Sequence, residues 1–401
     1  MSIETLAANA ARIVAIGPPP GSALEKALSI VWGVGRRCNF ACSYCSKEFH
    51  DKTSPHRSFG ELRGIWTKIR QAMAPRDLVA TIEFTGGEAT LNPDFLGFVR
   101  FLDQKQRPWL RQMGMTSNGS ATLEYYEELT KHLDWLTLST HFEWWDENRF
   151  MTTLLDLKRS LTQRGRSWAV NVNLMYEEWN APEIQKIKQV LDAENIQSTP
   201  IYIYNIHGSK GIANKSSTPF DYDRYLHSRG ITPTPAPEPS VSAPSVSAPS
   251  TAEPGIAIPS APEPERSLTD ILLEHSGSLE NANTELTLDD GSRVLVHSQT
   301  FTNLHLNNFP GWKCNAGKDR IFINVDGEVY GGMCRMVEKG NIRKELKLSE
   351  QPVVCDGRDC HCMSDIIVKK WKDDLYAPAG ERAPKPAADK SAASRVASVA
   401  D

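Results

Sequence analysis

The sequence predicts an α/β protein whose parallel strands alternate with helices. Between residues 28 and 206, short runs rich in β-branched and aromatic residues alternate with stretches of helical character. Consecutive strands separated by helices pair in parallel, because each connection must cross over the sheet. The chain is therefore expected to form an α/β barrel or an open doubly wound sheet, with functional side chains just past the carboxyl ends of the strands. The expected strands are 27–35, 79–87, 113–120, 135–142, 168–176 and 199–206, and the expected helices include 58–74, 122–133, 148–163 and 181–194.

Composition limits the class of protein. The 401 residues, 40% of them apolar, can bury a large core and suggest two domains. A formal net charge of -4 argues against a nucleic-acid partner. No run approaches the roughly 18 apolar residues of a membrane span, and the N-terminus lacks a signal-peptide core. We therefore expect a cytoplasmic protein without a membrane partner, in which clustered cysteines more often hold metal than form disulfides.

A segment rich in proline, serine and alanine divides the chain. Residues 232–265 contain the motif SVSAP twice in tandem and hardly any large apolar side chain. Such a segment cannot bury enough surface to offset the entropy of ordering it, and the C-terminal tail has a similar composition. The expected organisation is an N-terminal arm (1–27), a core domain (28–229), a disordered linker (230–266), a C-terminal domain (267–376) and a disordered tail (377–401).

Three cysteines follow the first expected strand. Cys38, Cys42 and Cys45 form a CxxxCxxC motif within the stretch GRRCNFACSYC. Three thiolates on one loop can hold three corners of an iron–sulfur cubane and leave the fourth iron open to another ligand, whereas a closed structural zinc site needs four protein ligands. A zinc site completed by a distant His or Cys, or buried free thiols, are the alternative interpretations.

Polar residues also follow the next three strands. The second strand ends in Gly86, Gly87 and Glu88, where glycines allow the backbone to approach a ligand and a carboxylate can accept hydrogen bonds from an ammonium group. A turn and the capping of strand ends are the structural alternatives. The third and fourth strands end in TSNG, with Ser117 and Asn118, and in STH, with Ser139.

These motifs, in this order, resemble the radical S-adenosylmethionine (radical SAM) enzymes. The resemblance covers residues 30–204 and includes the aromatic Tyr44 just before the third cysteine. It implies a partial (β/α)6 barrel, similar to a TIM barrel, that holds a 4Fe-4S cluster. It also implies that the open iron binds S-adenosylmethionine, whose reductive cleavage gives methionine and a 5'-deoxyadenosyl radical that abstracts a substrate hydrogen.

The resemblance implies roles for the site residues. Cys38, Cys42 and Cys45 would bind the cluster as metal ligands, and Tyr44 would border the adenine. No catalytic residue can be named from the sequence. The remaining cofactor contacts would be Gly86, Gly87 and Glu88 at the methionyl ammonium, and Ser117, Asn118 and Ser139 at the ribose or the carboxylate.

A second group of cysteines lies near the C-terminus. Residues 320–333 read as a β-hairpin with an Asp326-Gly327 turn and a cysteine on either side. This arrangement resembles the SPASM and twitch extensions of radical SAM enzymes, which implies a small hairpin and helix domain with one auxiliary 4Fe-4S cluster. The alternative is a zinc site with His361 nearby. The first-choice ligands are Cys314, Cys334, Cys360 and Cys362, with Cys355 either replacing one of them or staying free.

The substrate is not encoded as clearly as the cofactor. The run from His141 to Asp146 could form a substrate wall or pack beneath the C-terminal domain. We expect an oxidoreductase or transformase that modifies a peptide or protein and takes its electron from a flavodoxin or ferredoxin. The alternatives are a radical SAM dehydrogenase or rearrangement enzyme acting on a sugar or nucleotide-like small molecule, and a non-enzymatic iron–sulfur or zinc protein.

Overall fold

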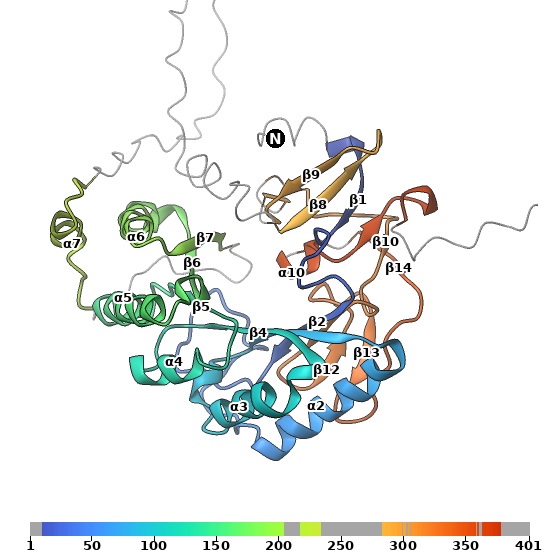
Figure 1. The fold of residues 1–401 in the computed structure, drawn as a ribbon, viewed down its shortest axis with the longest axis horizontal. Helices are drawn as coiled ribbons and strands as arrows, with labels where there is room; N and C mark the ends of the chain where they lie inside the picture. The colour runs from blue at the N-terminus through green and yellow to red at the C-terminus, as the bar shows by residue number, and fades with distance from the viewer. Residues whose placement is uncertain are drawn as a thin grey trace, which may run out of the picture.

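The computed structural model describes an α/β protein built on two sheets (Figure 1). It describes residues 10–203, 217–233, 283–298, 300, 301, 304, 306–357, 359, 360 and 363–377. Most of the expected linker, the tail beyond residue 377, residues 267–282 and Cys362 lie outside this part of the chain.

The larger sheet contains six parallel strands in the order of the chain. Each strand pairs in parallel with the next, from β2 to β7, as expected for a barrel wound in one direction. The sheet is not closed, so the predicted α/β fold takes the form of a partial barrel. These strands are β2 (Ala27–Gly33), β3 (Val79–Thr85), β4 (Leu110–Ser117), β5 (Trp135–Ser139), β6 (Val170–Tyr176) and β7 (Gln197–Tyr202).

Helices follow the outer face of this sheet in chain order (Figure 1). The first of them begins at a capping box, in which Ser58 and Glu61 each bind the other's backbone N–H, and its buried residues recur at helical spacing from Leu62 to Met73. The helices are α2 (Phe59–Met73), α3 (Phe95–Gln106), α4 (Leu123–Leu129), α5 (Glu147–Gln163), α6 (Ala181–Ala193) and α7 (Tyr222–Ser228), with short 3-10 helices at Ala10–Arg12, Ala74–Arg76, Ala89–Leu91, Arg107–Trp109, Ser167–Ala169, Glu178–Asn180 and Asp374–Tyr376.

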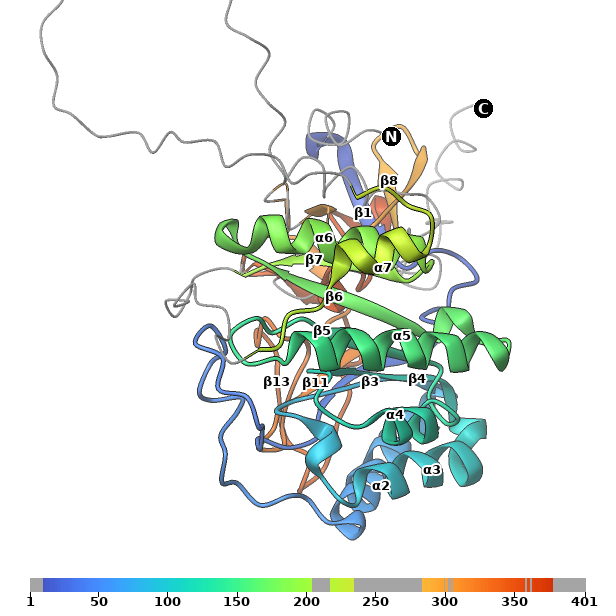
Figure 2. The same ribbon diagram turned by 90° about the vertical axis from the view of Figure 1, so that its left-hand side faces the viewer.

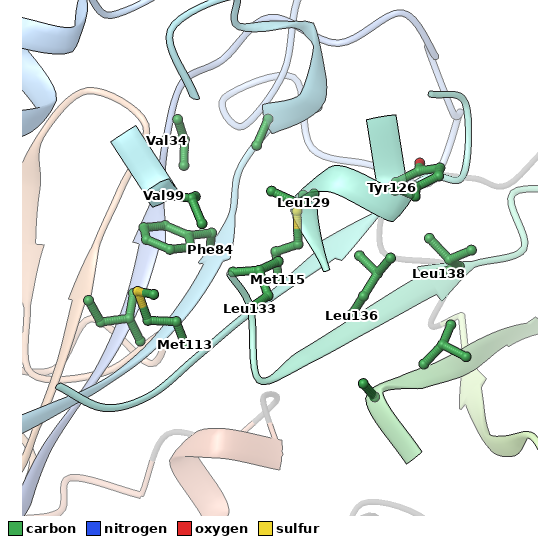
Figure 3. Packing of buried hydrophobic residues seen from close by; sticks show 14 of the residues in the cluster. Val34, Phe84, Val99, Met113, Met115, Tyr126, Leu129, Leu133, Leu136 and Leu138 are labelled. Atoms are coloured by element: carbon green, nitrogen blue, oxygen red, sulfur yellow. The ribbon is translucent and has the colours of Figure 1, made fainter. Parts of the chain in front are cut away.

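The core lies between the strands and these helices. Figure 3 shows Phe84 of β3 and Met115 of β4 packed toward Val99 of α3 and Leu129 of α4. Along β6 the side chains alternate, so that the apolar residues face the core and Asn171 and Asn173 face the other side of the sheet. The sheet therefore presents a polar inner surface opposite the helices.

The C-terminal hairpin extends the larger sheet. Strand β11 (Arg320–Ile323) pairs in parallel with β2, and β12 (Glu328–Tyr330) and β13 (Glu338–Asn341) follow it in antiparallel order. The predicted hairpin is present, with Gly327 at a φ of 90° in its turn. It lies directly beside the strand that leads into the cysteine loop.

The smaller sheet joins the two ends of the chain. Strand β1 (Ile13–Gly17), in the expected N-terminal arm, pairs with strands near the C-terminus on both of its edges. Residues 13–17 of the expected arm are therefore part of this sheet. The other strands are β8 (Thr284–Leu288), β9 (Arg293–Val296), β10 (Lys313–Cys314), β14 (Val353–Val354) and β15 (Lys370–Trp371), and a short helix α10 (Met363–Ile366) precedes β15. Figure 2 shows this sheet above the strands of the partial barrel.

Candidate cofactor site

The cysteine loop packs against the backbone of the strand end after β3. Gly87 N donates to Gly35 O and Glu88 N donates to Arg37 O, each at 2.8 Å. A Cβ on Gly87 would lie 2.5 Å from Arg36 O, and a Cβ on Gly86, whose φ is 122°, would lie 2.6 Å from Gly35 O. The two glycines therefore give the cysteine loop room to approach this strand end, a reason that the sequence alone did not supply.

The three thiols of this loop lie together in a largely buried setting. Burial raises the pKa of Cys42 to about 12 and that of Cys45 to about 11, and it also raises the pKa of Cys38. The thiols add to this effect, since Cys45 and Cys38 each raise the pKa of Cys42. Thiols held this way keep their protons until a cation replaces them, so metal loading must release protons here.

The buried carboxylate of Glu88 forms hydrogen bonds with residues at the ends of β3 and β4. Its side chain is buried and accepts hydrogen bonds from Thr90 N, Thr90 Oγ1, Ser117 Oγ and Asn118 N, at 2.7 to 3.1 Å. Burial raises the pKa of this carboxyl group, while these hydrogen bonds lower it. The carboxylate therefore connects the end of β3 to the end of β4.

Asn118 contacts two residues of the cysteine loop, Cys38 and Asn39. Its Nδ2 donates to Asn39 Oδ1 at 2.9 Å and lies 3.9 Å from Cys38 Sγ. The structure thus brings Glu88, Ser117 and Asn118 together beside the thiols. Ser139 lies one strand further on, where its Oγ accepts a hydrogen bond from Asn173 Nδ2 at 3.4 Å.

Two residues after β5 hold the segment between Cys42 and Cys45. His141 Nδ1 lies 2.6 Å from Tyr44 Oη and 3.7 Å from Cys42 Sγ. Glu143 accepts hydrogen bonds from Ser43 N, at 2.6 Å, and from Ser43 Oγ. Burial lowers the pKa of His141 to about 4, so its imidazole is neutral near pH 7. This loop therefore fixes both residues that separate the two cysteines.

The other aromatics of this run divide between packing and exposure. Phe142 and Trp145 are buried, with ring centroids 4.8 Å apart, and belong to the core. Trp144 is 39% exposed, and Lys52 Nζ lies 4.7 Å from its ring centroid. Trp179, which follows β6, is similarly exposed. No pattern in the sequence separates the packed rings from the exposed ones.

Four C-terminal thiols also gather in one place. Cys355 and Cys314 interact electrostatically, Cys334 interacts with both, and Cys360 interacts with Cys314 and Cys334. Burial raises the pKa of Cys334 to about 11 and that of Cys360 to about 12. The structure therefore places Cys355 with the other thiols, while Cys362 lies outside the described residues.

Two features are absent from the described residues. In the part of the chain that the structure describes, no group of three or more His, Cys, Asp or Glu side chains is arranged around a single metal ion. Across those same residues, no helix is long and apolar enough to cross a membrane.

Comparison with known proteins relates the segment that contains the first site to a family. Residues 32–142 match the family model described as "Radical SAM superfamily". This segment is similar to radical SAM domains. Over 83 residues, this chain is 34% identical to a GTP 3',8-cyclase of Haemophilus influenzae (strain PittEE). That alignment spans 21% of this chain and 23% of the cyclase.

Solved structures of radical SAM proteins are also similar to this chain. Streptococcus suis SuiB bound to S-adenosylmethionine is 13% identical with a TM-score of 0.42, over 80% of this chain and 64% of SuiB. Native anSMEcpe with bound AdoMet is 14% identical with a TM-score of 0.42, over 79% of this chain and 78% of that protein. BtrN in complex with AdoMet and 2-DOIA is 15% identical with a TM-score of 0.30, over 44% of this chain and 70% of BtrN.

The cofactors of the radical SAM domain follow from this assignment. Radical SAM proteins use a 4Fe-4S cluster and S-adenosylmethionine, and three thiols on one loop, one buried and two half-buried, fit a cluster that has one open iron. Sequence reasoning missed several side chains around this site. Glu143 and His141 were interpreted as part of a run that forms a substrate wall or packs beneath the C-terminal domain, not as partners of the cysteine loop. Glu83 and Asn173 on the inner face of the sheet were not named.

Proposed function

We propose that this chain is a radical SAM enzyme with an auxiliary iron–sulfur cluster, acting on a peptide or protein. The observation that carries the proposal is the loop of three adjacent thiols, one buried and two half-buried, which Glu88 after β3 and Glu143 after β5 hold in place. When bound, the cluster and S-adenosylmethionine supply a 5'-deoxyadenosyl radical that abstracts a substrate hydrogen.

The residues of the chain prepare this site in distinct ways. Cys38, Cys42 and Cys45 would hold the cluster, while Gly86 and Gly87, through their backbone, and Glu88 would border the methionyl group. Tyr44, Ser117, Asn118 and Ser139 would complete the cofactor contacts. Because the Glu88 carboxylate already accepts hydrogen bonds within the protein, its direct part is to orient the strand ends that meet the cofactor.

The inner face of the sheet offers groups for the substrate. Thr116 Oγ1 lies 3.4 Å from Glu83 Oε1, and Ser364 Oγ, from the C-terminal part of the chain, lies 3.0 Å from Glu83 Oε2. Trp144 and Trp179 are exposed at the ends of neighbouring strands and could contact apolar peptide side chains. These positions favour a substrate held between the strand ends and the C-terminal part of the chain.

The auxiliary cluster would use the C-terminal thiols. We propose Cys314, Cys334, Cys355 and Cys360 as its ligands, because each of these thiols interacts with Cys314, Cys334 or both, and Cys362 as the thiol that replaces one of them in the alternative set. The surrounding C-terminal domain would be twitch-like. A flavodoxin or ferredoxin would supply the electron.

A second candidate substrate is a nucleotide-like small molecule. The local similarity to a GTP 3',8-cyclase favours it, although the chain spans only 23% of that protein. In this case the chain would be a radical SAM rearrangement enzyme or dehydrogenase. Incubation of the loaded enzyme with GTP, or with a library of peptides, separates the two candidates by which one consumes S-adenosylmethionine above the background rate.

The first experiment is anaerobic reconstitution followed by iron analysis and an assay for 5'-deoxyadenosine. The expected result is about eight irons per chain for two cubane clusters, with 5'-deoxyadenosine formed after dithionite and S-adenosylmethionine are added. Replacing Cys38, Cys42 and Cys45 together with Ala should abolish this product and leave about four irons. Product formation in that variant would contradict the assignment of the radical site. A fully loaded wild-type chain that forms no product would support a non-enzymatic electron-transfer protein instead.

A further inference from the structure

A buried lysine lies beside the C-terminal thiols. Lys370, in β15, is only 1% exposed. Its Nζ donates to Asp365 O at 2.7 Å and to Ile366 O at 2.8 Å, and it lies 4.9 Å from the ring centroid of Phe309. Both acceptors are neutral carbonyl groups. Burying an ammonium group without an anionic partner costs a large amount of folding free energy. A negative charge near Lys370 would therefore stabilise the folded chain.

The nearby carboxylate of Asp365 forms an ion pair with Arg320 rather than with Lys370. Asp365 Oδ1 accepts a hydrogen bond from Arg320 Nε at 3.2 Å, and Asp365 Oδ2 accepts one from Met333 N at 2.6 Å. Asp365 and Arg320 are 4% and 1% exposed and balance each other's charge. One positive charge, that of Lys370, is left over in this buried group of three.

The thiols are placed to balance that charge. Cys314 is the direct cross-strand partner of Lys370 in the antiparallel pair of β10 and β15. Side chains in such pairs lie on the same face of the sheet, with Cβ atoms about 4.5–5.5 Å apart. Burial raises the pKa of Cys314 and of Cys360, and the Lys370 ammonium group acts against this by lowering both. The lysine thus favours the thiolate form that metal ligation requires.

We propose that Lys370 is the fixed counter-charge of the C-terminal thiolate site and raises the reduction potential of the iron–sulfur cluster held there. This inference rests on the proposed function, because it requires the auxiliary cluster. Reduction adds a negative charge to the site, and a buried cation beside it stabilises the reduced form more than the oxidised form. Lys370 is a positioning and tuning residue in this role, since it does not contact the substrate.

The test uses the full chain with Cys38, Cys42 and Cys45 replaced by Ala, so that the C-terminal cluster is observed alone. In this parent, Lys370→Met is compared with Lys370→Arg and with the matched control Lys369→Met, which removes the same charge from the adjacent, less buried position. An anaerobic redox titration followed by electron paramagnetic resonance gives the potential. Lys370→Met should lower the equilibrium constant for reduction at least tenfold, about 59 mV for a one-electron couple, and the other two variants should stay near the parent.

Each outcome separates this inference from the proposed function. An iron-loaded Lys370→Met variant with the potential of the parent would overturn the role of Lys370 alone. Loss of iron in Lys370→Met that Lys370→Arg restores would support a requirement for the positive charge, whereas loss in both variants would contradict it. A parent that binds no iron at the C-terminal site would overturn the auxiliary cluster itself, and with it this inference.

Discussion

Replacing Gly87 by Ala should force the cysteine loop away from the strand end after β3. The new Cβ would lie 2.5 Å from Arg36 O and 2.7 Å from Arg37 C, whereas Cβ contacts under 3.0 Å are essentially never observed. The backbone must therefore move by more than 0.5 Å, because relieving the contact with Arg36 O alone takes 0.5 Å and Arg37 O lies nearer still. Because the obstructing atoms are backbone rather than flexible side chains, the movement is transmitted to Cys38, next to Arg37. A displacement of about 0.5 Å is the limit that a functional site tolerates.

The assay measures both stability and the cofactor. Overpacking of this kind costs about 1–3 kcal/mol, so the variant should remain folded while it loses iron from the first site and forms much less 5'-deoxyadenosine. The matched control is Gly64→Ala in α2, where nothing lies within 4 Å of the new Cβ and the substitution should stabilise the helix by roughly 0.5–1 kcal/mol. A Gly87→Ala chain with full iron content and unchanged product formation would refute the reasoning.

Three further predictions concern charged groups. Glu143→Ala removes the acceptor of both hydrogen bonds from Ser43. Because hydrogen bonds to a charged group contribute about 1.5–3 kcal/mol, a chelator should remove iron from the first site roughly tenfold faster or more. An unchanged rate would show that the cysteine loop keeps its conformation without Glu143. Burial lowers the pKa of His141 from 6.5 in the unfolded chain to about 4 in the folded chain. The folded state is therefore most stable, with respect to this group, above pH 6.5, and it loses this stability as the pH falls from about 6.5 to 4. Denaturant unfolding of the metal-free chain should show this loss, amounting to about 3 kcal/mol for a shift of this size, and His141→Asn should abolish the part due to this group. Asp365→Ala removes the carboxylate that pairs with the buried Arg320 and should cost about 3–5 kcal/mol, against about 0–1 kcal/mol for Asp156→Ala in the exposed pair with Arg159. Equal losses would contradict the importance of burial.

The sequence predicted the parallel strands well because their signals are local. The apolar runs and the polar residues that end them alternate with helical segments in a fixed order, and β2 to β7 follow that order. Helix α3 was not named, although its buried residues Phe95, Phe98, Val99 and Leu102 have helical spacing. The apolar spacing of this segment therefore carries a local helix signal like that of the other helices.

Contacts between distant parts of the chain could not be predicted in the same way. Strand β1 reads as a short apolar run, IVAIG, and nothing in it specifies that its partners are β8 and β15. The glycines at 86 and 87 were interpreted as room for a ligand, whereas in the structure they first make room for the cysteine loop. Such roles depend on which backbone lies opposite, and a single sequence does not encode that in any local pattern.

The pairing of β11 with β2 has a consequence for how the protein is made. Strand β2 is completed early in synthesis, yet its outer edge stays unpaired until residues 320–323 have left the ribosome. During that interval the unfinished chain exposes an open strand edge and three thiols close to it. If the proposed cluster is inserted only into the completed loop, loading waits until residues 320–323 have been made, and chains truncated before this point should aggregate rather than accumulate as loaded barrels.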